Sequence, residues 1–322
     1  LWYGGTLVAG GRITVGQFVT FNFFLARLVW PMIAIGWVIN LAQRGSASWN
    51  RILQILETEP EIRDAVDCLR PEVEGAIRFH RLTFDYPGQT LPALREIDLE
   101  VAAGTLVAIV GRTGAGKSTL LSLLGRQWDP PPGSLFLDGI DVRSICLESL
   151  RRAVAAVPQE TFLFSASLAE NVAFGSPAEA PEQIRRVIEI AGLEEDLEAL
   201  PEGLDTRVGE RGVTLSGGQK QRVALARALL RDPRVLLLDD CLSAVDTRTE
   251  EQILARLEKA LDGRTVFLVS HRISTVQRAD LILVLDRGEI VERGDHRHLL
   301  AHGGIYADLH RRQQLEEELA AV

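Results

Sequence analysis

A glycine-rich stretch that contains a lysine gives the clearest chemical signal in the sequence. Residues 111–119 read GRTGAGKST, which matches the spacing GxxxxGK followed by Ser or Thr. Glycines let the backbone wrap closely around phosphate oxygens, Lys117 supplies a cation, and the Ser118 hydroxyl can bind Mg²⁺. The apolar run 106–111 precedes this loop and a helix-like run, LLSLLGR, follows it. The sequence therefore predicts a phosphate-binding loop between a strand and a helix.

Two adjacent aspartates offer the oxygens that a metal ion needs. The stretch 236–246 reads LLLDDCLSAVD, an apolar strand that ends in Asp239 and Asp240. A hard cation such as Mg²⁺ prefers carboxylate and hydroxyl oxygens, so we expect Asp239 and Ser118 to bind it together. Many phosphate-cleaving enzymes carry the longer Glu at the second position. Whether Asp240 still activates water is thus the main chemical question.

A third motif lies between these two, in residues 215–230, LSGGQKQRVALARALL. Ser216 and Gln219 have the spacing of a capping box, so they predict a helix that begins here. The start of a helix presents free N–H groups and a positive dipole end, both of which attract anions. Gly217 and Gly218 keep the approach to this helix start open, which favours a phosphate ligand over a merely well-capped helix.

Short apolar runs must position these motifs. Four of them alternate with helix-like stretches, at residues 106–111, 153–159, 234–240 and 265–271. Continuous apolar strands of this length are typical of a parallel sheet that helices cover on both faces. The predicted fold class is α/β.

The first 56 residues differ from the rest. Residues 17–43 form an apolar stretch long enough, at about 1.5 Å per residue, to cross a bilayer core of roughly 30 Å. A buried helix of a soluble protein is the alternative. Residues 1–10 are interpreted as the end of another span and 11–14 as an external turn. Arg44 and Arg51 follow the long span, which by the positive-inside tendency places the following chain in the cytoplasm.

Charge and composition set further limits. Residues 1–56 contain four Arg and no acid, whereas the whole chain has a net charge of −9, which argues against a nucleic-acid-binding body.

Arg27, within the span, could face a substrate pathway, or it could extend to the membrane surface or pair with a partner. We expect Cys68, Cys146 and Cys241 to be reduced, because they show no metal-binding spacing. The chain begins with Leu, so we expect a longer protein.

Residues 57–75 contain two prolines and a run of acids, and we place the boundary between the two parts there. The expected organisation is residues 1–56 as the end of a membrane domain, 57–75 as a linker, and 76–322 as the soluble domain.

Taken in order and spacing, the motifs resemble the nucleotide-binding domain of ABC transporters. They are GRTGAGKST, Gln159 in VPQE, LSGGQKQR, LLLDD, SAVD at 243–246, and His271 in VSHR. The resemblance covers residues 76–300 or more. Residues 1–56 resemble the end of the fifth and all of the sixth transmembrane helix of an exporter half-transporter, and especially the bacterial multidrug half-transporters that work as heterodimers. The resemblance implies a P-loop NTPase domain with a helical subdomain, preceded by the last helices of an all-α membrane domain.

This resemblance implies ATP and Mg²⁺ as cofactors and assigns roles to individual residues. Tyr86 in FDYPG matches the aromatic residue that stacks on adenine. The residues implied to bind ATP within this chain are Tyr86, Gly111, Arg112, Thr113, Gly114, Ala115, Gly116, Lys117, Ser118 and Thr119. Ser118, Gln159 and Asp239 match the Mg²⁺ site, and His271 matches the switch histidine that reaches the γ-phosphate.

The family also implies a second subunit, because two nucleotide domains close head to tail. Ser216, Gly217, Gly218 and Gln219 would then contact ATP held mainly by the partner, and Asp246 matches an acid at the dimer interface. Residues 209–212, GERG, resemble the exporter element that contacts the coupling helices, and the stretch after Gln159 resembles the exporter form of that region.

Asp240 departs from the family, which normally has Glu at this catalytic position. A general base must lie within about 2.6–3.2 Å of the attacking water. Losing one methylene withdraws the carboxylate by about 1.5 Å, and a misplacement of ~1 Å can cost ~100-fold in rate. We therefore expect catalytic residues Asp240, Gln159 and His271 to form a slow site, and a partner chain that keeps its Glu to form a fast one.

The leading hypothesis is one half of a heterodimeric multidrug-type exporter in the plasma (inner) membrane, multi-pass, with a cytoplasmic nucleotide domain. Its expected partners are a second half-transporter, membrane lipid and an unidentified small molecule, with no nucleic acid. A regulatory subunit that binds ATP without hydrolysing it is one alternative. DNA-repair and chromosome-organising ATPases are another, but their long coiled coils are missing between residues 119 and 215. Importer ATPases usually lack a fused membrane segment.

Overall fold

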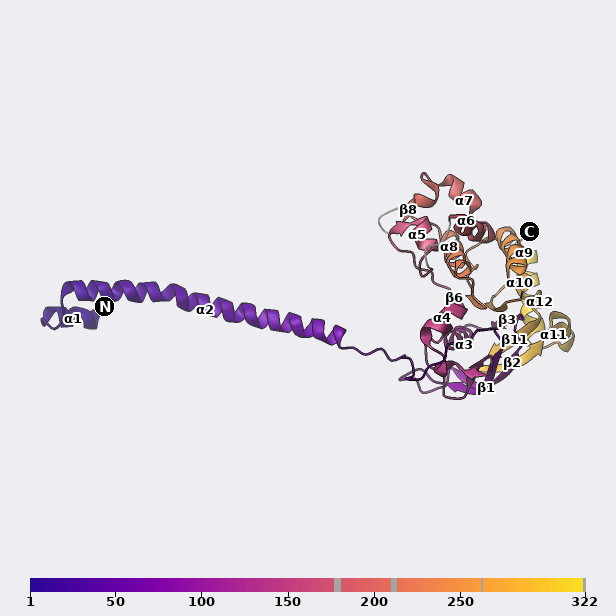
Figure 1. The fold of residues 1–322 in the computed structure, drawn as a ribbon, viewed down its shortest axis with the longest axis horizontal. Coiled ribbons are helices and arrows are strands. Elements are labelled where there is room, and N and C mark those ends of the chain that lie inside the picture. Colours follow the sequence, from indigo (N-terminus) through magenta and orange to yellow (C-terminus); the bar gives the residue numbers. More distant parts are fainter. Residues whose placement is uncertain (177–180, 210–212, 262, 321–322) are drawn as a thin grey trace. The chain divides into compact units, whose positions relative to one another are not determined.

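The computed structural model divides the chain into two compact units, Leu1–Glu61 and Ile62–Val322 (Figure 1). It describes residues 1–322 except 177–180, 210–212, 262 and 321–322. The unit boundary lies five residues after the predicted end of the membrane segment. Each unit is described by itself below.

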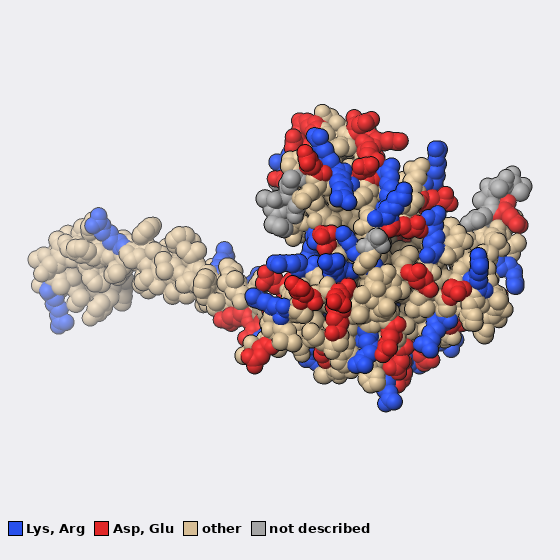
Figure 2. All heavy atoms as spheres, turned by 45° about the vertical axis from the view of Figure 1, so that its right-hand side comes forward, with Lys and Arg blue, Asp and Glu red and all other residues tan. Residues whose placement is uncertain are grey.

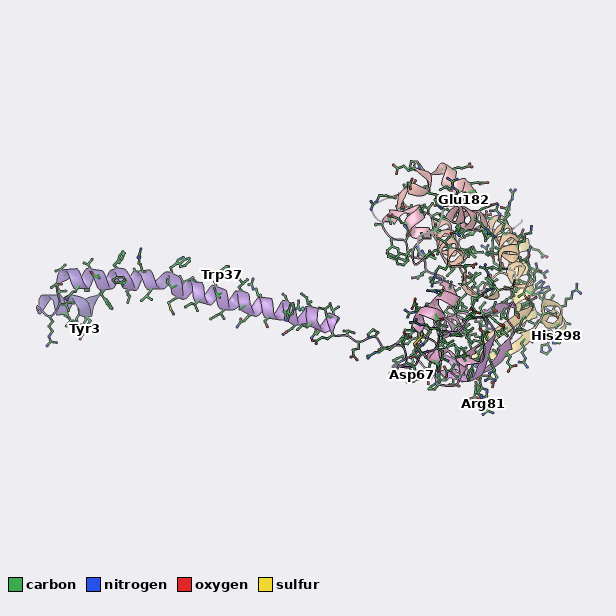
Figure 3. All side chains as sticks on the ribbon, viewed as in Figure 1. Tyr3, Trp37, Asp67, Arg81, Glu182 and His298 are labelled. Carbon is green, nitrogen blue, oxygen red and sulfur yellow. A yellow bond between two sulfur atoms is a disulfide. The ribbon has the colours of Figure 1, made fainter. Side chains whose placement is uncertain are left out.

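The first unit consists of two helices, α1 (Trp2–Ala9) and α2 (Val15–Leu56). Thr14 caps α2 in a capping box, because its hydroxyl accepts from Gln17 N at 3.2 Å and the Gln17 side chain accepts from Thr14 N at 2.9 Å. The helix is long and apolar enough to cross a membrane. Its aromatic side chains are exposed, with Trp30 at 75% and Trp37 at 68% (Figure 3).

The surface of α2 is nearly uncharged, whereas acids and bases cover the second unit (Figure 2). Exposed apolar surface of this extent has a favourable environment in lipid and an unfavourable one in water. The α2 helix therefore fits the last helix of a membrane domain. The guanidinium of Arg27 lies 5.1 Å from the centre of the Phe23 ring on the same helix, and its predicted place in a substrate pathway stays a prediction.

The second unit is built on a six-stranded sheet in the order β12-β11-β3-β10-β9-β6. The predicted apolar runs correspond to four neighbouring strands, and β11 extends the parallel set. The strands are β3 (Leu106–Gly111), β6 (Val154–Val157), β9 (Val235–Asp239), β10 (Thr265–Val269), β11 (Leu281–Asp286) and β12 (Glu289–Gly294), of which only β12 is antiparallel. The α/β fold class is confirmed.

A second, antiparallel sheet packs across this one in the order β2-β1-β4-β5. Its strands are β1 (Ile77–Phe84), β2 (Leu94–Val101), β4 (Leu135–Leu137) and β5 (Ile140–Asp141). Helix α3 (Lys117–Leu124) lies in the apolar core between the sheets, because its leucines share one cluster with Phe79 of β1 and Phe267 of β10. The phosphate loop leads from β3 into this helix, and its residues Arg112, Thr113 and Gly114 are exposed.

Helices cover the opposite face of the six-stranded sheet. The predicted helical subdomain comprises α5 (Leu168–Val172), α6 (Pro181–Ile190), α7 (Glu194–Ala199) and α8 (Gly217–Leu230), together with the short strands β7 (Ala166–Ser167) and β8 (Arg207–Val208). Figure 1 shows these helices together, away from β1 and β2. The remaining helices are α4 (Leu147–Ala153), α9 (Thr247–Ala260), α10 (Ile273–Val276), α11 (His296–His302) and α12 (Ile305–Ala320), with 3₁₀ turns η1 (Val142–Ser144) and η2 (Gly203–Asp205).

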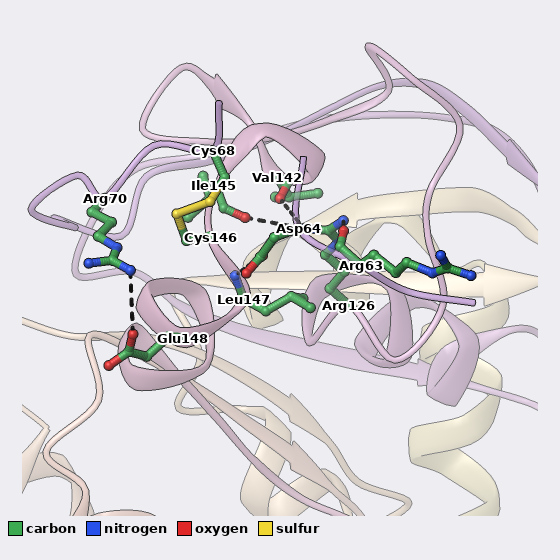
Figure 4. The surroundings of a disulfide bond; sticks show 10 residues. All are labelled: Arg63, Asp64, Cys68, Arg70, Arg126, Val142, Ile145, Cys146, Leu147 and Glu148. Carbon is green, nitrogen blue, oxygen red and sulfur yellow. Dashed lines mark hydrogen bonds and ion pairs between the residues drawn. A yellow bond between two sulfur atoms is a disulfide. The ribbon is translucent and has the colours of Figure 1, made fainter. Parts of the chain in front are cut away.

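The cysteine prediction is wrong for two of the three residues. Cys68 and Cys146 form a disulfide with a Cα–Cα distance of 4.9 Å (Figure 4). They are 78 residues apart in sequence, but residues around Cys68 run beside the turn before α4, where Leu69 and Ile145 form a parallel bridge. Cys241 is a free thiol and is buried, as expected for a reduced cysteine.

One carboxylate holds the segment that leads into β1. Asp138 accepts hydrogen bonds from the backbone N–H groups of Glu74, Gly75 and Ala76, at 2.8, 3.0 and 2.7 Å. Asp138 follows β4 with a φ of +51°, a left-handed conformation that Asp and Asn tolerate better than most residues.

We predict that Asp138→Ala lowers the free energy of unfolding of the second unit by about 1–3 kcal/mol, because three backbone donors lose a charged acceptor. Pulse proteolysis across a urea gradient measures this. Asp138→Asn keeps one acceptor oxygen and the tolerance of positive φ, so it should cost clearly less. Equal urea midpoints for Asp138→Ala and the unsubstituted chain would show that this carboxylate does not contribute to the stability of the second unit.

Candidate functional site

The phosphate loop is shaped by glycines that have no room for a side chain. Gly111 has a φ of +149°, and a Cβ there would lie 2.2 Å from the carbonyl oxygen of Leu285. Gly116 has a φ of +102°, and its Cβ would lie 2.8 Å from the carbonyl oxygen of Ala93. The loop can therefore follow this path only with glycine at both positions.

Lys117 is folded back over the loop. Its Nζ donates to the carbonyl oxygens of Gly111 at 2.8 Å and Arg112 at 3.0 Å, and the residue is only 8% exposed. Burial lowers the pKa of Lys117 from its usual value, and the neighbouring carboxylates of Asp239 and Asp240 oppose that shift. The ammonium group thus lies at the loop, where a phosphate would offer it an anionic acceptor in addition to these neutral carbonyl oxygens.

Most of the predicted site residues line one cavity of about 550 Å³, a volume within the usual range for small-molecule sites. They come from both sheets, α3 and the carboxyl ends of β9 and β10. The predicted residues in the wall are Tyr86, Thr113, Gly114, Gly116, Lys117, Ser118, Thr119, Gln159, Asp239, Asp240 and His271. Gly111, Arg112 and Ala115 belong to the same loop.

The metal side of the cavity offers few protein ligands. Ser118, Gln159 and Asp239 all line it, but the described residues contain no cluster of three or more His, Cys, Asp or Glu that could bind a metal by themselves. Mg²⁺ usually binds through one or two carboxylates, waters and substrate phosphates. The donor set therefore fits a Mg²⁺ ion that arrives with a nucleotide.

Asp240 follows β9 with a left-handed φ of +46°. Its N–H donates to the carbonyl oxygen of Val269 at 3.0 Å, and its Oδ2 accepts from Gln159 Nε2 at 3.5 Å, a long contact. Burial raises the pKa of the Asp240 carboxyl, and the charge on Asp239 adds to this rise. The charges of His271, Lys117 and Arg272 act in the opposite direction. The backbone of Asp240 is therefore held in place, and burial makes its carboxyl more basic, although the side chain is short.

Arg272 is a residue that the sequence analysis missed. It ion-pairs with the buried Glu250 of α9, and its Nη2 donates to the carbonyl oxygen of Val245 at 3.0 Å. Thr275 completes the network by donating to Glu250 at 2.5 Å. This network joins the loop after β9 to the loop that carries His271. The nearest sequence signal is the Arg next to His271, but its acidic partner lies 22 residues away.

Tyr86 is fixed by contacts that the sequence analysis also missed. Its hydroxyl donates to Thr119 Oγ1 at 3.2 Å, and its ring packs edge to face against Phe84 and Trp128, with centroid distances of 5.1 and 5.3 Å. Trp128 is the one tryptophan in residues 62–322, a signal that could have marked it.

Helix α8 begins within the LSGGQ motif of residues 215–219, which is called the signature of this chain, at the place that the capping-box spacing predicts. Ser216 caps α8, because its hydroxyl accepts from Gln219 N at 3.2 Å and Gln219 Oε1 accepts from Ser216 N at 2.7 Å. A Cβ on Gly218 would lie 2.7 Å from the carbonyl oxygen of Ala244, so this glycine is required by packing within the chain as well. Ser216–Gln219 do not line the cavity of the phosphate loop.

Asp246 has a structural role in this chain. Its carboxylate caps α9 by accepting from Thr249 N at 3.0 Å, and these hydrogen bonds lower its pKa. Its predicted contact across a dimer interface stays a prediction.

The comparisons with known proteins agree with these motifs. A family model described as ABC transporter matches residues 94–243. The chain belongs to the ABC transporter family. It is 43% identical over 315 residues to a probable multidrug resistance ABC transporter ATP-binding/permease protein, YheI, of Bacillus subtilis (strain 168), covering 98% of this chain and 54% of the relative. Against the multidrug resistance-like ATP-binding protein MdlA of Escherichia coli (strain K12), identity is 42%, with coverage of 98% and 53%.

A solved structure supports the same assignment. The structure of a bacterial Atm1-family ABC exporter with ATP bound matches with a TM-score of 0.82 and 37% identity, over 96% of this chain and 55% of that one. The chain thus spans about half the length of the relatives it matches, and it carries the nucleotide-binding domain together with the helix that precedes it.

The ABC domain also carries an exposed aromatic cluster, formed by Phe162, Phe164 and Phe174. Phe162 and Phe174 are 66% and 52% exposed, and ring centroids are 5.2 Å apart for Phe162–Phe164 and 4.3 Å for Phe164–Phe174. The guanidinium of Arg227 lies 5.8 and 5.7 Å from the rings of Phe164 and Phe174. Of the predicted exporter element 209–212, residues 210–212 lie outside the described residues.

We predict that Trp128→Ala weakens ATP binding by up to about tenfold, because an edge-to-face pair contributes about 0.5–1.5 kcal/mol and Tyr86 would lose one of its two. Titration with a fluorescent ATP analogue measures this. Trp128→Phe keeps an aromatic edge and should lose less. Tyr86→Ala should cost about 1–3 kcal/mol of base stacking, and adding Trp128→Ala to it should cost little more. Full, additive losses in the double variant would mean that Trp128 acts independently of Tyr86.

Proposed function

We propose that this chain is the C-terminal part of one half of an ATP-driven membrane exporter, and that its ATPase site is shared with a second half. The observation that carries the proposal is a separation within the chain. The phosphate loop, the aspartates, Gln159 and His271 line one cavity, whereas the signature residues 216–219 lie outside it. The chain therefore carries both sets of nucleotide-binding residues, those of the cavity and those of residues 216–219. A second domain in head-to-tail orientation would bring one set from each chain onto the same nucleotide.

In the proposed reaction, the loop N–H groups and Lys117 bind the phosphates of ATP, and Tyr86 stacks on adenine. Ser118, Asp239 and Gln159 would hold Mg²⁺, which supplies charge neutralisation at the β- and γ-phosphates. His271 would contact the γ-phosphate, and Asp240 would orient the attacking water. The raised pKa of Asp240 favours proton acceptance, but its shorter side chain works against correct placement.

We further propose that Asp240 makes this the slow site of a heterodimer whose other chain carries Glu. Support comes from an intact set of phosphate and metal ligands beside a shortened base. Relatives that match this chain include multidrug transporters, so an exporter of the multidrug type is the favoured reading. Other relatives are named ATP-dependent lipid A-core flippase, as in Xanthomonas oryzae pv. oryzae, which is 41% identical. We therefore propose export without assigning one compound.

The proposed location is the inner membrane, with α2 as the last of several spans and the nucleotide-binding domain in the cytoplasm. The aromatic cluster of Phe162, Phe164 and Phe174 follows Gln159 and is solvent-exposed, which suits a surface that receives the coupling helices of the membrane domain. An ATP-binding regulatory subunit without hydrolysis of its own is the second candidate, favoured by Asp240 alone.

We predict that Asp240→Asn changes ATP turnover of the assembled pair less than about twofold, because a misplaced base contributes little. Glu→Gln at the matching position of the partner should lower turnover by ~100-fold or more. Steady-state hydrolysis in membranes that contain equal amounts of both chains measures both. Two equally inactive variants would mean that Asp240 is a working base, and so would brisk hydrolysis by a homodimer of this chain.

We predict that Ser216→Arg abolishes turnover at the partner's site while ATP still binds to this chain's phosphate loop, because the long cation would block the start of α8. Photo-crosslinked ATP quantified on each subunit, together with turnover, is the measurement. Lys117→Ala is the matched control and should remove the label from this chain. Loss of label on this chain in Ser216→Arg, with turnover preserved, would contradict the head-to-tail arrangement.

A further inference from the structure

We propose that Cys68 and Cys146 form a reversible thiol–disulfide site, oxidised by small disulfides such as glutathione disulfide, that fastens residues 62–70 to the ATPase domain. Residues 62–70 are called the connector below. They follow α2 closely in sequence and contain no helix. Figure 4 shows the connector beside the turn that leads into α4.

Backbone pairing brings the two cysteines together. Leu69 N donates to the carbonyl oxygen of Ser144 at 2.8 Å, and Cys146 N donates to the carbonyl oxygen of Leu69 at 2.9 Å. Asp64 adds a third link, because its Oδ1 accepts from Leu147 N at 2.6 Å. The connector is thus aligned with the turn by hydrogen bonds on both sides of the disulfide, which keeps the two sulfur atoms close after reduction.

A buried arginine, Arg126, connects the connector to the end of α3. Arg126 follows α3 and is only 2% exposed. Its Nη2 donates to the carbonyl oxygen of Arg63 in the connector at 2.9 Å, and its Nη1 donates to those of Val142 and Ile145 at 3.3 and 3.1 Å. The carboxylate of Asp129 balances the charge of Arg126, with Oδ1 lying 2.7 Å from the arginine Nε. Reduction would therefore loosen the connector without unfolding the domain, because Arg126 still holds it.

The two cysteines differ in access, which gives the exchange an order. Cys68 is half-buried, whereas Cys146 is 3% exposed. The Cys68 thiolate would attack a small disulfide and release one small thiol, and the Cys146 thiolate would then displace the second. Overall, two protein thiols and one small disulfide give the Cys68–Cys146 disulfide and two small thiols. The protein is oxidised and the small disulfide reduced, with protons conserved.

Cys241, the third cysteine, cannot take part in this thiol–disulfide exchange. It is completely buried, and burial raises the pKa of its thiol to about 12, so almost no thiolate forms. In reducing compartments, disulfides that do form are usually transient and redox-sensing. A pair that hydrogen bonds already align, and of which Cys68 is the less buried member, suits such a role. Under the function proposed above, oxidation would stiffen the segment between the ATPase domain and α2.

The first test uses the full-length transporter in native membranes, equilibrated with glutathione buffers that range from fully reduced to fully oxidised. Acid quenching, maleimide labelling and peptide mass spectrometry measure the Cys68–Cys146 linkage. We expect linkage to rise with the oxidised share and to reverse when reduced glutathione is added. Cys241→Ser should behave as the unsubstituted chain, and Cys68→Ser should show no linkage. Two free thiols in oxidised glutathione alone, or a disulfide reducible only after unfolding, would overturn the proposal.

The second test asks whether the disulfide fastens the connector. Hydrogen exchange of peptides that contain the amides of Leu69 and Cys146 should speed up about tenfold on reduction. Cys68→Ser should exchange at the fast rate in both buffers. Equal exchange in the oxidised and reduced states would contradict the fastening role. Neither test depends on ATP hydrolysis, so both remain decisive if the proposed function fails. ATPase rates with and without reductant, compared between the unsubstituted chain and Cys68→Ser, then test the effect on coupling.

Discussion

The close approach of backbone segments at the phosphate loop is the constraint on which the rest of the structure depends. The loop passes the end of β11 and the start of β2 so tightly that Gly111 and Gly116 cannot carry a Cβ. Gly288 connects these neighbours, since its N–H donates to the carbonyl oxygen of Ala115 and its carbonyl accepts from Arg95 N. The two sheets therefore meet at the loop. This meeting sets the path of the loop relative to Tyr86, which follows β1 of the antiparallel sheet and lines the same cavity.

Charge inside the cavity follows from that geometry. Lys117 is buried, which lowers its pKa, and the charges of Asp239 and Asp240 at the end of β9 oppose that shift. Burial raises the pKa of the Asp240 carboxyl, and the charge of Asp239 adds to that rise. A nucleotide with Mg²⁺ suits this arrangement, because phosphates can satisfy Lys117 while the cation satisfies Asp239. Within this logic the shortness of Asp240 affects water placement and leaves ligand binding intact.

Much of this could be predicted from local sequence, and the exceptions have a common cause. Apolar runs located four adjacent strands, and the Ser216–Gln219 spacing located a helix start, because both depend on neighbours in sequence. The Trp128 contact with Tyr86, the Arg272–Glu250 pair and the Cys68–Cys146 disulfide join residues 22 to 78 positions apart. Such pairings depend on how sheets and loops pack, and the types of the residues alone do not reveal them. Residues 57–75 were interpreted only as a linker from their prolines and acids, whereas Leu69 within them pairs with Ile145 in the turn before α4.

The loop after Asp240 and the signature helix form one hydrogen-bonded body. Ser243 Oγ donates to the carbonyl oxygen of Asp240 at 2.9 Å and accepts from Gln221 Nε2 of α8 at 3.1 Å. The same Gln221 accepts from Ala244 N at 3.0 Å, and Gly218 leaves no space between α8 and Ala244. These contacts connect the backbone of Asp240 to α8 through the side chains of Ser243 and Gln221, whatever the length of the Asp240 side chain. Because this route uses the backbone of Asp240 and not its carboxylate, we propose that a change at the nucleotide site could reach α8 even where the carboxylate is a weak base.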